Sequence, residues 1–419
     1  MAKLRTNILL LTIVQASNYL LPLLTLPYLG RVLSVNAFGR LALAQALTQY
    51  LVMLTEYGFN LTATRRISIA RSDRQAVSRI FTDTLAAKTV LAAAGYAFVM
   101  ALVSIVPKFE GMALLVSASY VGVIGSVLLP LWLFQGLEDM KLLVLASSTA
   151  RILAVIAIFL TVHDDRDLVS AAVLQNAGTL FAGLIAVGLI RYHRTASLLR
   201  PSWQGTWAAM KDGWSMFLAN IAISFYTTLN TVLLGLFGTS SDVAYFSAAD
   251  KLRFAAQGVL QPIAQAIYPR VSLAFSEGRQ DDARRLMKKG GALLVTLAIA
   301  AGTLFIFGSE PIASHYLGPD LQPAAFYLRL LAGLPLIIAI AITIGQWGLL
   351  GAGQSGKMSR IYLICGFCHL IYAIPLIFAW KGTGLIVSVY LTEFLATGAM
   401  VLIFCKCARP LQPGRTLIV

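Results

Sequence analysis

The sequence is poor in charged residues and in cysteine, and each shortage excludes a class of protein. Charged residues make up 12% of the 419 residues, whereas hydrophobic residues make up 58%. No water-soluble core could bury so much apolar surface, so the composition predicts a polytopic membrane protein. The four cysteines all follow residue 360 and indicate no disulfide framework. No P-loop sequence is present, which argues against direct use of ATP, and no cofactor is expected.

Acidic residues are also scarce. The chain has 18 Asp and Glu against 33 Lys and Arg, a formal net charge of +15. Such an excess often indicates nucleic-acid binding, but here the basic residues lie in short connections between apolar segments. This distribution follows the positive-inside rule and argues against a nucleic-acid partner. The basic connections alternate with less basic ones and include both ends of the chain, so both termini are expected in the cytoplasm.

The lengths of the apolar segments set the expected number of spans. A bilayer core of ~30 Å requires ~20 apolar residues per helix. The first apolar segment, 8–29, is too long for a signal-peptide core and should remain in the protein as a span. The sequence therefore predicts an all-α membrane protein with twelve transmembrane helices. The expected spans are 8–30, 38–58, 81–106, 111–136, 142–162, 168–190, 213–237, 243–268, 290–308, 323–350, 358–380 and 382–405.

A weak internal repeat divides these spans into two halves. The segment LGRVLSVNAFGRLALAQAL, from Leu29, aligns with LGLFGTSSDVAYFSAADKL, from Leu234, and the alignment pairs Gln45 with Asp250. Parallel six-helix repeats are typical of transporters with a central site near the bilayer midplane. We therefore expect two pseudo-symmetric six-helix lobes around a central cavity. Their bounds are 1–190 and 213–419, the second with a cytoplasmic tail, and a cytoplasmic linker, 191–212, joins them.

The most unusual segment is 242–270, which is long enough to span a bilayer but carries Asp250, Lys251 and Arg253 near its middle. A charge at the centre of a spanning helix costs ~2.5–3.5 kcal/mol on insertion scales, so such groups normally face a polar interior. Asp250, Arg253 and Gln257 follow i, i+3, i+7 spacing and should share one helical face. This face is predicted to form part of the wall of the cavity.

Other polar residues within the spans are weaker candidates. Asn18 and Gln45 could face the cavity, and Arg40 is either an anchor at the membrane surface or a group at the outer mouth of the cavity. Glu393 lies too deep to reach water easily, so it is either paired with Arg253 or Lys251, or protonated in an apolar site. The second state would suit proton coupling, for which Asp250 is the other candidate.

Several apparent motifs are better explained without special chemistry. Lys88 and Arg151 lie one to two turns inside their spans, where a long side chain is expected to extend to the headgroups. Cys365 and Cys368 form a C-x-x-C, but the remaining cysteines should lie ~10 Å away in depth, which disfavours a zinc site. The acidic segment 163–167 is short enough to be a solvated turn. No sizeable outer loop is available for a membrane glycosyltransferase or polymerase.

The first eighty residues also resemble a known family. The run from Leu24 to Asp73 is similar to the amino-terminal signature of bacterial polysaccharide flippases, the O-antigen unit translocases of the multidrug, oligosaccharidyl-lipid and polysaccharide exporter superfamily. The segment SAADKLRFAAQGVLQPIAQAIYPR resembles the second signature of the same family. The elements that carry the first resemblance are Pro27-Tyr28-Leu29-Gly30, Phe38-Gly39, Glu56-Tyr57-Gly58-Phe59-Asn60-Leu61 and Thr64-Arg65-Arg66.

The resemblance implies movement of undecaprenyl-diphosphate-linked oligosaccharide from the cytoplasmic to the periplasmic leaflet of the bacterial inner membrane by alternating access. The expected partners are this lipid-linked glycan, membrane lipid, H⁺ or Na⁺ as a coupling ion, and the polysaccharide polymerase and chain-length machinery. By this resemblance the cationic cavity role falls on Arg253 and Lys251, supported by Arg40. An ion-coupled multidrug exporter is the alternative, since it shares the two-lobe plan.

Overall fold

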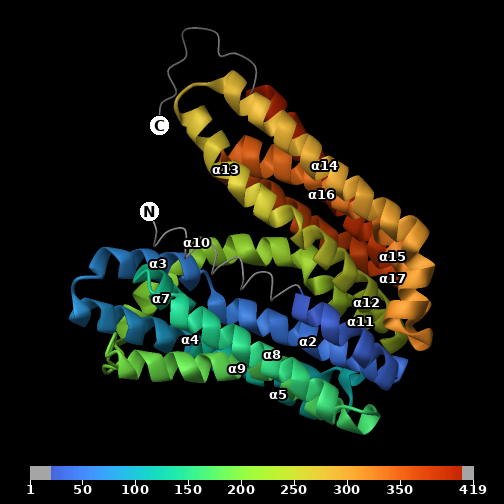
Figure 1. The fold of residues 1–419 in the computed structure, drawn as a ribbon, viewed down its shortest axis with the longest axis horizontal. Coiled ribbons are helices and arrows are strands. Elements are labelled where there is room, and N and C mark those ends of the chain that lie inside the picture. Colours follow the sequence, from blue (N-terminus) through green and yellow to red (C-terminus); the bar gives the residue numbers. More distant parts are fainter. Residues whose placement is uncertain (1–19, 408–419) are drawn as a thin grey trace.

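The structure is a computed structural model that describes residues 20–407, and every regular element in this range is a helix (Figure 1). The prediction of an all-α protein is confirmed. The first half contains Leu20–Val32, α2 (Val35–Glu56), α3 (Phe59–Ala70), α4 (Arg74–Ile105), η1 (Pro107–Phe109), α5 (Ala113–Ser119), α6 (Val121–Leu128), α7 (Leu131–Gly136), α8 (Lys141–Thr161), η2 (Asp165–Asp167) and α9 (Leu168–Tyr192). The second half contains α10 (Trp203–Thr227), α11 (Leu229–Phe237), α12 (Ser240–Gly258), α13 (Leu260–Ser276), α14 (Gln280–Pro311), η3 (Ile312–Leu317), η4 (Pro319–Leu321), α15 (Ala324–Leu330), η5 (Leu331–Gly333), α16 (Leu334–Ala341), η6 (Ile342–Leu350) and α17 (Ser355–Cys407).

Seven helices within residues 20–407 are long and apolar enough to cross a membrane, or eight if the bent pair α10–α11 forms one span. Helices rich in polar side chains, α2 and α12 among them, are not in this count. The long α17 is counted as one of the seven helices. It contains two helical segments, however, because Lys381 between them has non-helical backbone angles. This break lies at the turn that the sequence predicts between the last two spans.

The repeat is visible in the helix boundaries. Ser34 caps α2 by accepting a hydrogen bond from the backbone of Ala37, and Thr239 begins α12 in a capping box with Asp242. Hydroxyl caps satisfy amide groups that have no partner inside a helix. The two capping residues stand 205 residues apart. This is the same shift along the sequence that aligns the two halves of the repeat, so α2 and α12 begin at equivalent positions. These two helices also pack against each other.

The eighth expected span, 243–268, is divided into α12 and α13 at Val259. Pro262 explains the position of this break. Proline has no amide hydrogen to donate to the carbonyl four residues earlier, which belongs to Gly258, and its ring crowds that carbonyl. The helix therefore ends at Gly258 and restarts at Leu260.

The expected linker, 191–212, is shorter in the structure because α10 already begins at Trp203. The remaining segment is held against α4 by backbone hydrogen bonds. Ser197 donates to the Ser78 hydroxyl at 3.0 Å, and Ser202 donates to the Asp83 carboxylate at 3.1 Å. The connection between the halves is therefore fixed to the first half, and the next bend in the chain is the 46° break between α10 and α11.

The two halves meet along α2, α11 and α12, and also where α10 packs against α3 and α4; from this junction α13 leads away from the first half (Figure 1). The largest apolar core runs through this junction, from Leu41 in the first half to Ile386 in the second. The diverging ends include α3 on one side and the α13–α14 connection on the other. Both carry basic residues: Arg65, Arg66, Arg71, Arg279, Arg284 and Arg285.

Candidate functional site

The charged residues of α12 form one hydrogen-bonded group. Arg253 donates through Nε to the Asp250 carboxylate at 2.6 Å and through Nη1 to the Gln257 side-chain oxygen at 2.8 Å. Arg253 is 7% exposed, so this ion pair lies in the protein interior rather than in lipid. Asp250 is the eleventh residue of α12, which at 1.5 Å per residue places it ~15 Å along the helix, about half of a bilayer core.

A small cavity of about 60 Å³ adjoins this group. It is enclosed by α10, α11, α12, η5, α16 and the second segment of α17, and Glu393 reaches it from α17. The cavity is small, and in this conformation it offers room for water or a small cation beside the ion pair. Its lining residues are Tyr226, Thr227, Asn230, Phe246, Asp250, Arg253, Phe254, Gln257, Leu331, Leu334, Ile338, Val389 and Glu393.

Two carboxyl groups and one guanidinium share this cavity, so it is not simply cationic. Arg253 is already balanced by Asp250. Glu393 has no ion-pair partner among residues 20–407, although the sequence left pairing with Arg253 or Lys251 open. Any anion that binds Arg253 must therefore compete with Asp250.

Lys251 points away from this cavity and reaches the first half of the protein. Its ammonium donates to the Gln45 side-chain oxygen on α2 at 3.1 Å and lies 5.7 Å from the centre of the Phe38 ring. Among the described residues no carboxylate lies within ion-pair distance of it. Lys251 thus provides a positive charge at the junction of the halves, with no counter-charge in the part of the chain that the structure describes.

Arg40 does not join this group. Its guanidinium donates to the Gly111 carbonyl at 2.7 Å, in the connection that follows η1, and it does not line the cavity. Arg40 therefore holds the connection that follows η1, and its two expected roles, at the membrane surface or at the outer mouth of the cavity, stay predictions. Asn18 lies outside the described residues.

A buried histidine beside the cavity was not singled out from the sequence. His369 is fully buried, and its ring nitrogens lie 2.9 Å from the Asn230 side-chain oxygen and 2.7 Å from the Thr392 hydroxyl. The Asn230 amide also donates to the Tyr226 carbonyl at 2.8 Å, beside the bend between α10 and α11. The sequence signal that could have identified His369 is an ionisable side chain in the middle of an apolar run.

The expectation for Lys88 was wrong. Instead of extending to the headgroups, Lys88 is fully buried, donates to Glu56 at 2.9 Å and donates to the Ser126 carbonyl at 2.7 Å. The pair joins the end of α2 to α4 and α6. Glu56 stands 32 residues earlier in the chain, so no local pattern could indicate the pairing.

The connection after α14 closes one end of the junction. The Arg31 guanidinium donates to the His315 carbonyl, and the Tyr316 hydroxyl donates to the Leu23 carbonyl. Close by, α2 and α12 touch backbone to backbone, because a Cβ added at Gly39 would lie 2.0 Å from the Ser240 carbonyl oxygen. These contacts are made through Leu23, Arg31, Gly39, Ser240, His315 and Tyr316. We call them the outer seal, after the side on which the positive-inside rule predicts them.

Comparisons with known proteins agree with this architecture. Residues 4–275 match the profile of a family described as polysaccharide biosynthesis protein. The chain is similar to two proteins described as O-antigen transporters: one from Shigella dysenteriae, 35% identical over 93% of this chain and 97% of the relative, and one from Escherichia coli K12, 32% identical over 95% and 96%. Among solved structures, the lipid II flippase MurJ in an inward closed conformation gives a TM-score of 0.74, with 11% identity, 94% of this chain and 87% of that chain covered.

Proposed function

The chain belongs to the family of polysaccharide biosynthesis proteins, and from this premise we propose that it moves undecaprenyl-diphosphate-linked oligosaccharide units from the cytoplasmic to the periplasmic leaflet. It is a multi-pass protein of a bacterial inner membrane and a transporter rather than an enzyme. The observation that supports the proposal is the position of two cations inside the protein: Arg253 is buried, and Lys251 reaches the junction of the halves.

The substrate headgroup supplies the anion that these cations require. A diphosphate attracts cations more strongly where water is scarce, because the Coulomb energy rises as the effective dielectric falls. Lys251 has no carboxylate partner within residues 20–407 and so is the first contact for the diphosphate. Arg253 is the second, once the diphosphate displaces Asp250. Gln45 and Gln257, which now accept hydrogen bonds from these two cations, would then turn to the sugars.

This competition gives a physical route to ion coupling. When Asp250 or Glu393 takes up a proton, the negative charge that opposes the substrate near Arg253 is lost, and diphosphate binding is favoured. When the proton leaves, Asp250 again pairs with Arg253 and the diphosphate is released. The coupling ion in this scheme is H⁺, and both carboxyl groups line the same small cavity.

The arrangement of the halves supports alternating access. We propose twelve spans in two lobes, 1–190 and 213–419, with both termini in the cytoplasm. The diverging ends of the lobes carry arginine-rich connections, which the positive-inside rule assigns to the cytoplasm. The outer seal lies at the opposite end, and we infer from this arrangement an inward-facing state. Export requires the outer seal to open while the diverging ends approach each other.

The outer seal can be tested at Gly39. We expect Gly39→Val to reduce transport about tenfold, because overpacking of 1–3 kcal/mol would hold α2 and α12 apart and disfavour this state. Transport by purified variants in proteoliposomes is the measurement. Gly188→Val is the matched control, since nothing lies within 4 Å of a Cβ added at that helical glycine. Wild-type transport by Gly39→Val would show that the backbone contact is dispensable.

The proposed function is tested by reconstitution. Purified protein in proteoliposomes should move a fluorescent undecaprenyl-diphosphate-linked oligosaccharide between leaflets, measured as its accessibility to a membrane-impermeant quencher. A proton gradient should accelerate the movement, and the cationic dye ethidium should not be exported. Export of ethidium without movement of the glycan lipid would instead identify a multidrug exporter.

A further inference from the structure

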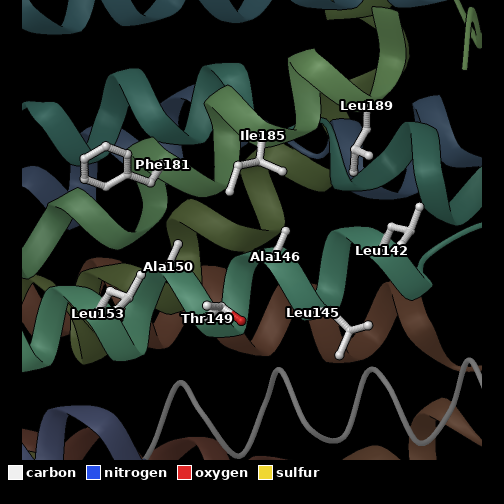
Figure 2. A pocket seen from close by; sticks show the side chains of 9 residues that line it. All are labelled: Leu142, Leu145, Ala146, Thr149, Ala150, Leu153, Phe181, Ile185 and Leu189. Carbon is white, nitrogen blue, oxygen red and sulfur yellow. The ribbon is translucent and has the colours of Figure 1, made fainter. Parts of the chain in front are cut away.

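A second cavity lies on the first half, between α8 and α9, and is distinct from the cavity beside α12. Its volume is about 490 Å³. Figure 2 shows Phe181, Ile185 and Leu189 of α9 along one wall and the side chains of α8 along the other. The α8 residues are Leu142, Leu145, Ala146, Thr149, Ala150 and Leu153, so Thr149 is the one polar residue of the lining. We call this cavity the α8–α9 groove.

The groove results from a pattern of small and large side chains. Ala146 and Ala150 stand one turn apart on α8 and leave space, while leucines flank them. Leu145 and Leu153 remain more than half exposed, as does Phe181 on the facing helix. An open, elongated, apolar groove of this kind fits a hydrocarbon chain, since branched side chains on both walls provide only dispersion contacts and apolar burial.

One end of the groove is basic. Figure 2 places Leu142 and Leu189 together at the same end. The exposed Lys141 directly precedes Leu142, and the exposed Arg191 and Arg194 closely follow Leu189. Asp139 is an acid near this end, whereas the neighbouring Glu138 lies 3.8 Å from Arg71 in an ion pair. The balance of charge at this end is therefore positive.

The same end carries free backbone donors. Helix α8 begins at Lys141 after Met140, and its N-terminus has no side-chain cap. The first amide groups of a helix lack intrahelical partners and, with the helix dipole, favour a phosphate. Lys141 stands at the first position of this helix, so a phosphate there would meet both its ammonium and the amide groups.

The depth of the groove matches one leaflet. From Leu142 to Leu153 the helix rises ~16 Å at 1.5 Å per residue, about half of a ~30 Å bilayer core. Tyr192, which is 82% exposed, follows Arg191 and marks the level of the headgroups, where tyrosine is enriched. The groove therefore extends from the headgroup level to the bilayer centre and no farther.

We propose that the α8–α9 groove binds one anionic phospholipid of the cytoplasmic leaflet. Lys141, Arg191 and the N-terminus of α8 hold its phosphate, and one acyl chain lies along Ala146 and Ala150. The bound lipid would join α8 to α9 over the inner half of the membrane. This inference rests on the groove alone and is independent of which substrate the central site carries.

Binding is tested with purified protein in detergent. Phosphatidylglycerol should raise the melting temperature by several degrees more than phosphatidylcholine with the same acyl chains, and native mass spectrometry should show one retained phosphatidylglycerol. Lys141→Ala/Arg191→Ala should abolish the preference for phosphatidylglycerol. Ala146→Leu, which fills the groove, should reduce retention of both lipids. Lys288→Ala/Lys289→Ala is the matched control, because it removes two exposed lysines from α14 and should keep the preference.

Three results would overturn the proposal. The first is an equal rise in the melting temperature of the wild-type protein with either lipid. This measurement does not depend on whether a variant folds. The second is an equal loss of preference in the α14 control, which would indicate nonspecific attraction to a basic protein. The third is displacement of phosphatidylglycerol by an equimolar amount of undecaprenyl phosphate, which would identify the carrier lipid as the occupant.

Discussion

Replacement of Arg253 with alanine is expected to reduce glycan-lipid transport at least about tenfold, the effect of losing one charge-assisted contact of about 1.5–3 kcal/mol. The variant removes the guanidinium that would bind the diphosphate and leaves Asp250 without its ion-pair partner. Arg253→Lys keeps the positive charge but cannot donate to Asp250 and Gln257 through separate nitrogens, so this variant should retain partial transport. Movement of a fluorescent substrate in proteoliposomes is the measurement.

A structural role for Arg253 must be separated from a role in substrate binding. Asp250→Asn/Arg253→Met removes both charges and avoids a buried unpaired carboxylate, so it should restore stability but not transport. Full transport by this double variant would show that Arg253 only neutralises Asp250. Arg270→Ala is the matched control, because Arg270 is an exposed arginine on α13 and its loss should leave transport unchanged.

The largest effect on stability is expected at Lys88. Lys88→Met should lower the free energy of unfolding by about 3 kcal/mol, because removal of one partner of a buried ion pair leaves the other charge uncompensated. Glu56 would be that charge, and one of its carboxylate oxygens already has no hydrogen-bond partner within residues 20–407. The Ser126 carbonyl would also lose its donor. Thermal unfolding of the purified variant measures the effect.

A double-mutant cycle tests the origin of this loss. Lys88→Met/Glu56→Gln removes both charges and should recover most of the stability, whereas Lys211→Met, at an exposed lysine of α10, should cost almost nothing. If Lys88→Met unfolds at the wild-type temperature, the ion pair contributes nothing to the fold. If the double variant is as unstable as the single one, packing around the lysine stem is the cause.

The sequence predicted those features that depend on local chemistry. Apolar length and basic connections indicated a helical membrane protein, and the breaks near 106–111 and at Lys381 coincide with predicted turns. The signatures around Gly30, Glu56 and Asp250 indicated the family. Pro262 also divides a predicted span for a local reason, so this break was within reach of the sequence.

The partners of the buried charges could not be predicted in the same way. Spacing along α12 was sufficient to bring Arg253 near Asp250 and Gln257, because three and seven residues of one helix bring side chains to the same face. It gave no information on Lys251, whose partner Gln45 is 206 residues away, or on the role of Arg40 at Gly111. The outer connection also had no pattern that indicated its contact with Leu23 and Arg31.

The sequence by itself determined that this chain folds into membrane helices, that two of its turns lie near 106–111 and at Lys381, and that Asp250, Arg253 and Gln257 share one helical face. These properties follow from hydropathy, turn chemistry and helical spacing, which act over a few residues. Only the tertiary structure decided that Lys88 pairs with Glu56, that Glu393 shares a cavity with Asp250, and that Lys251 lies between the halves. The physical reason is that contacts between helices depend on how each helix is rotated and packed, and that choice is made by the whole core.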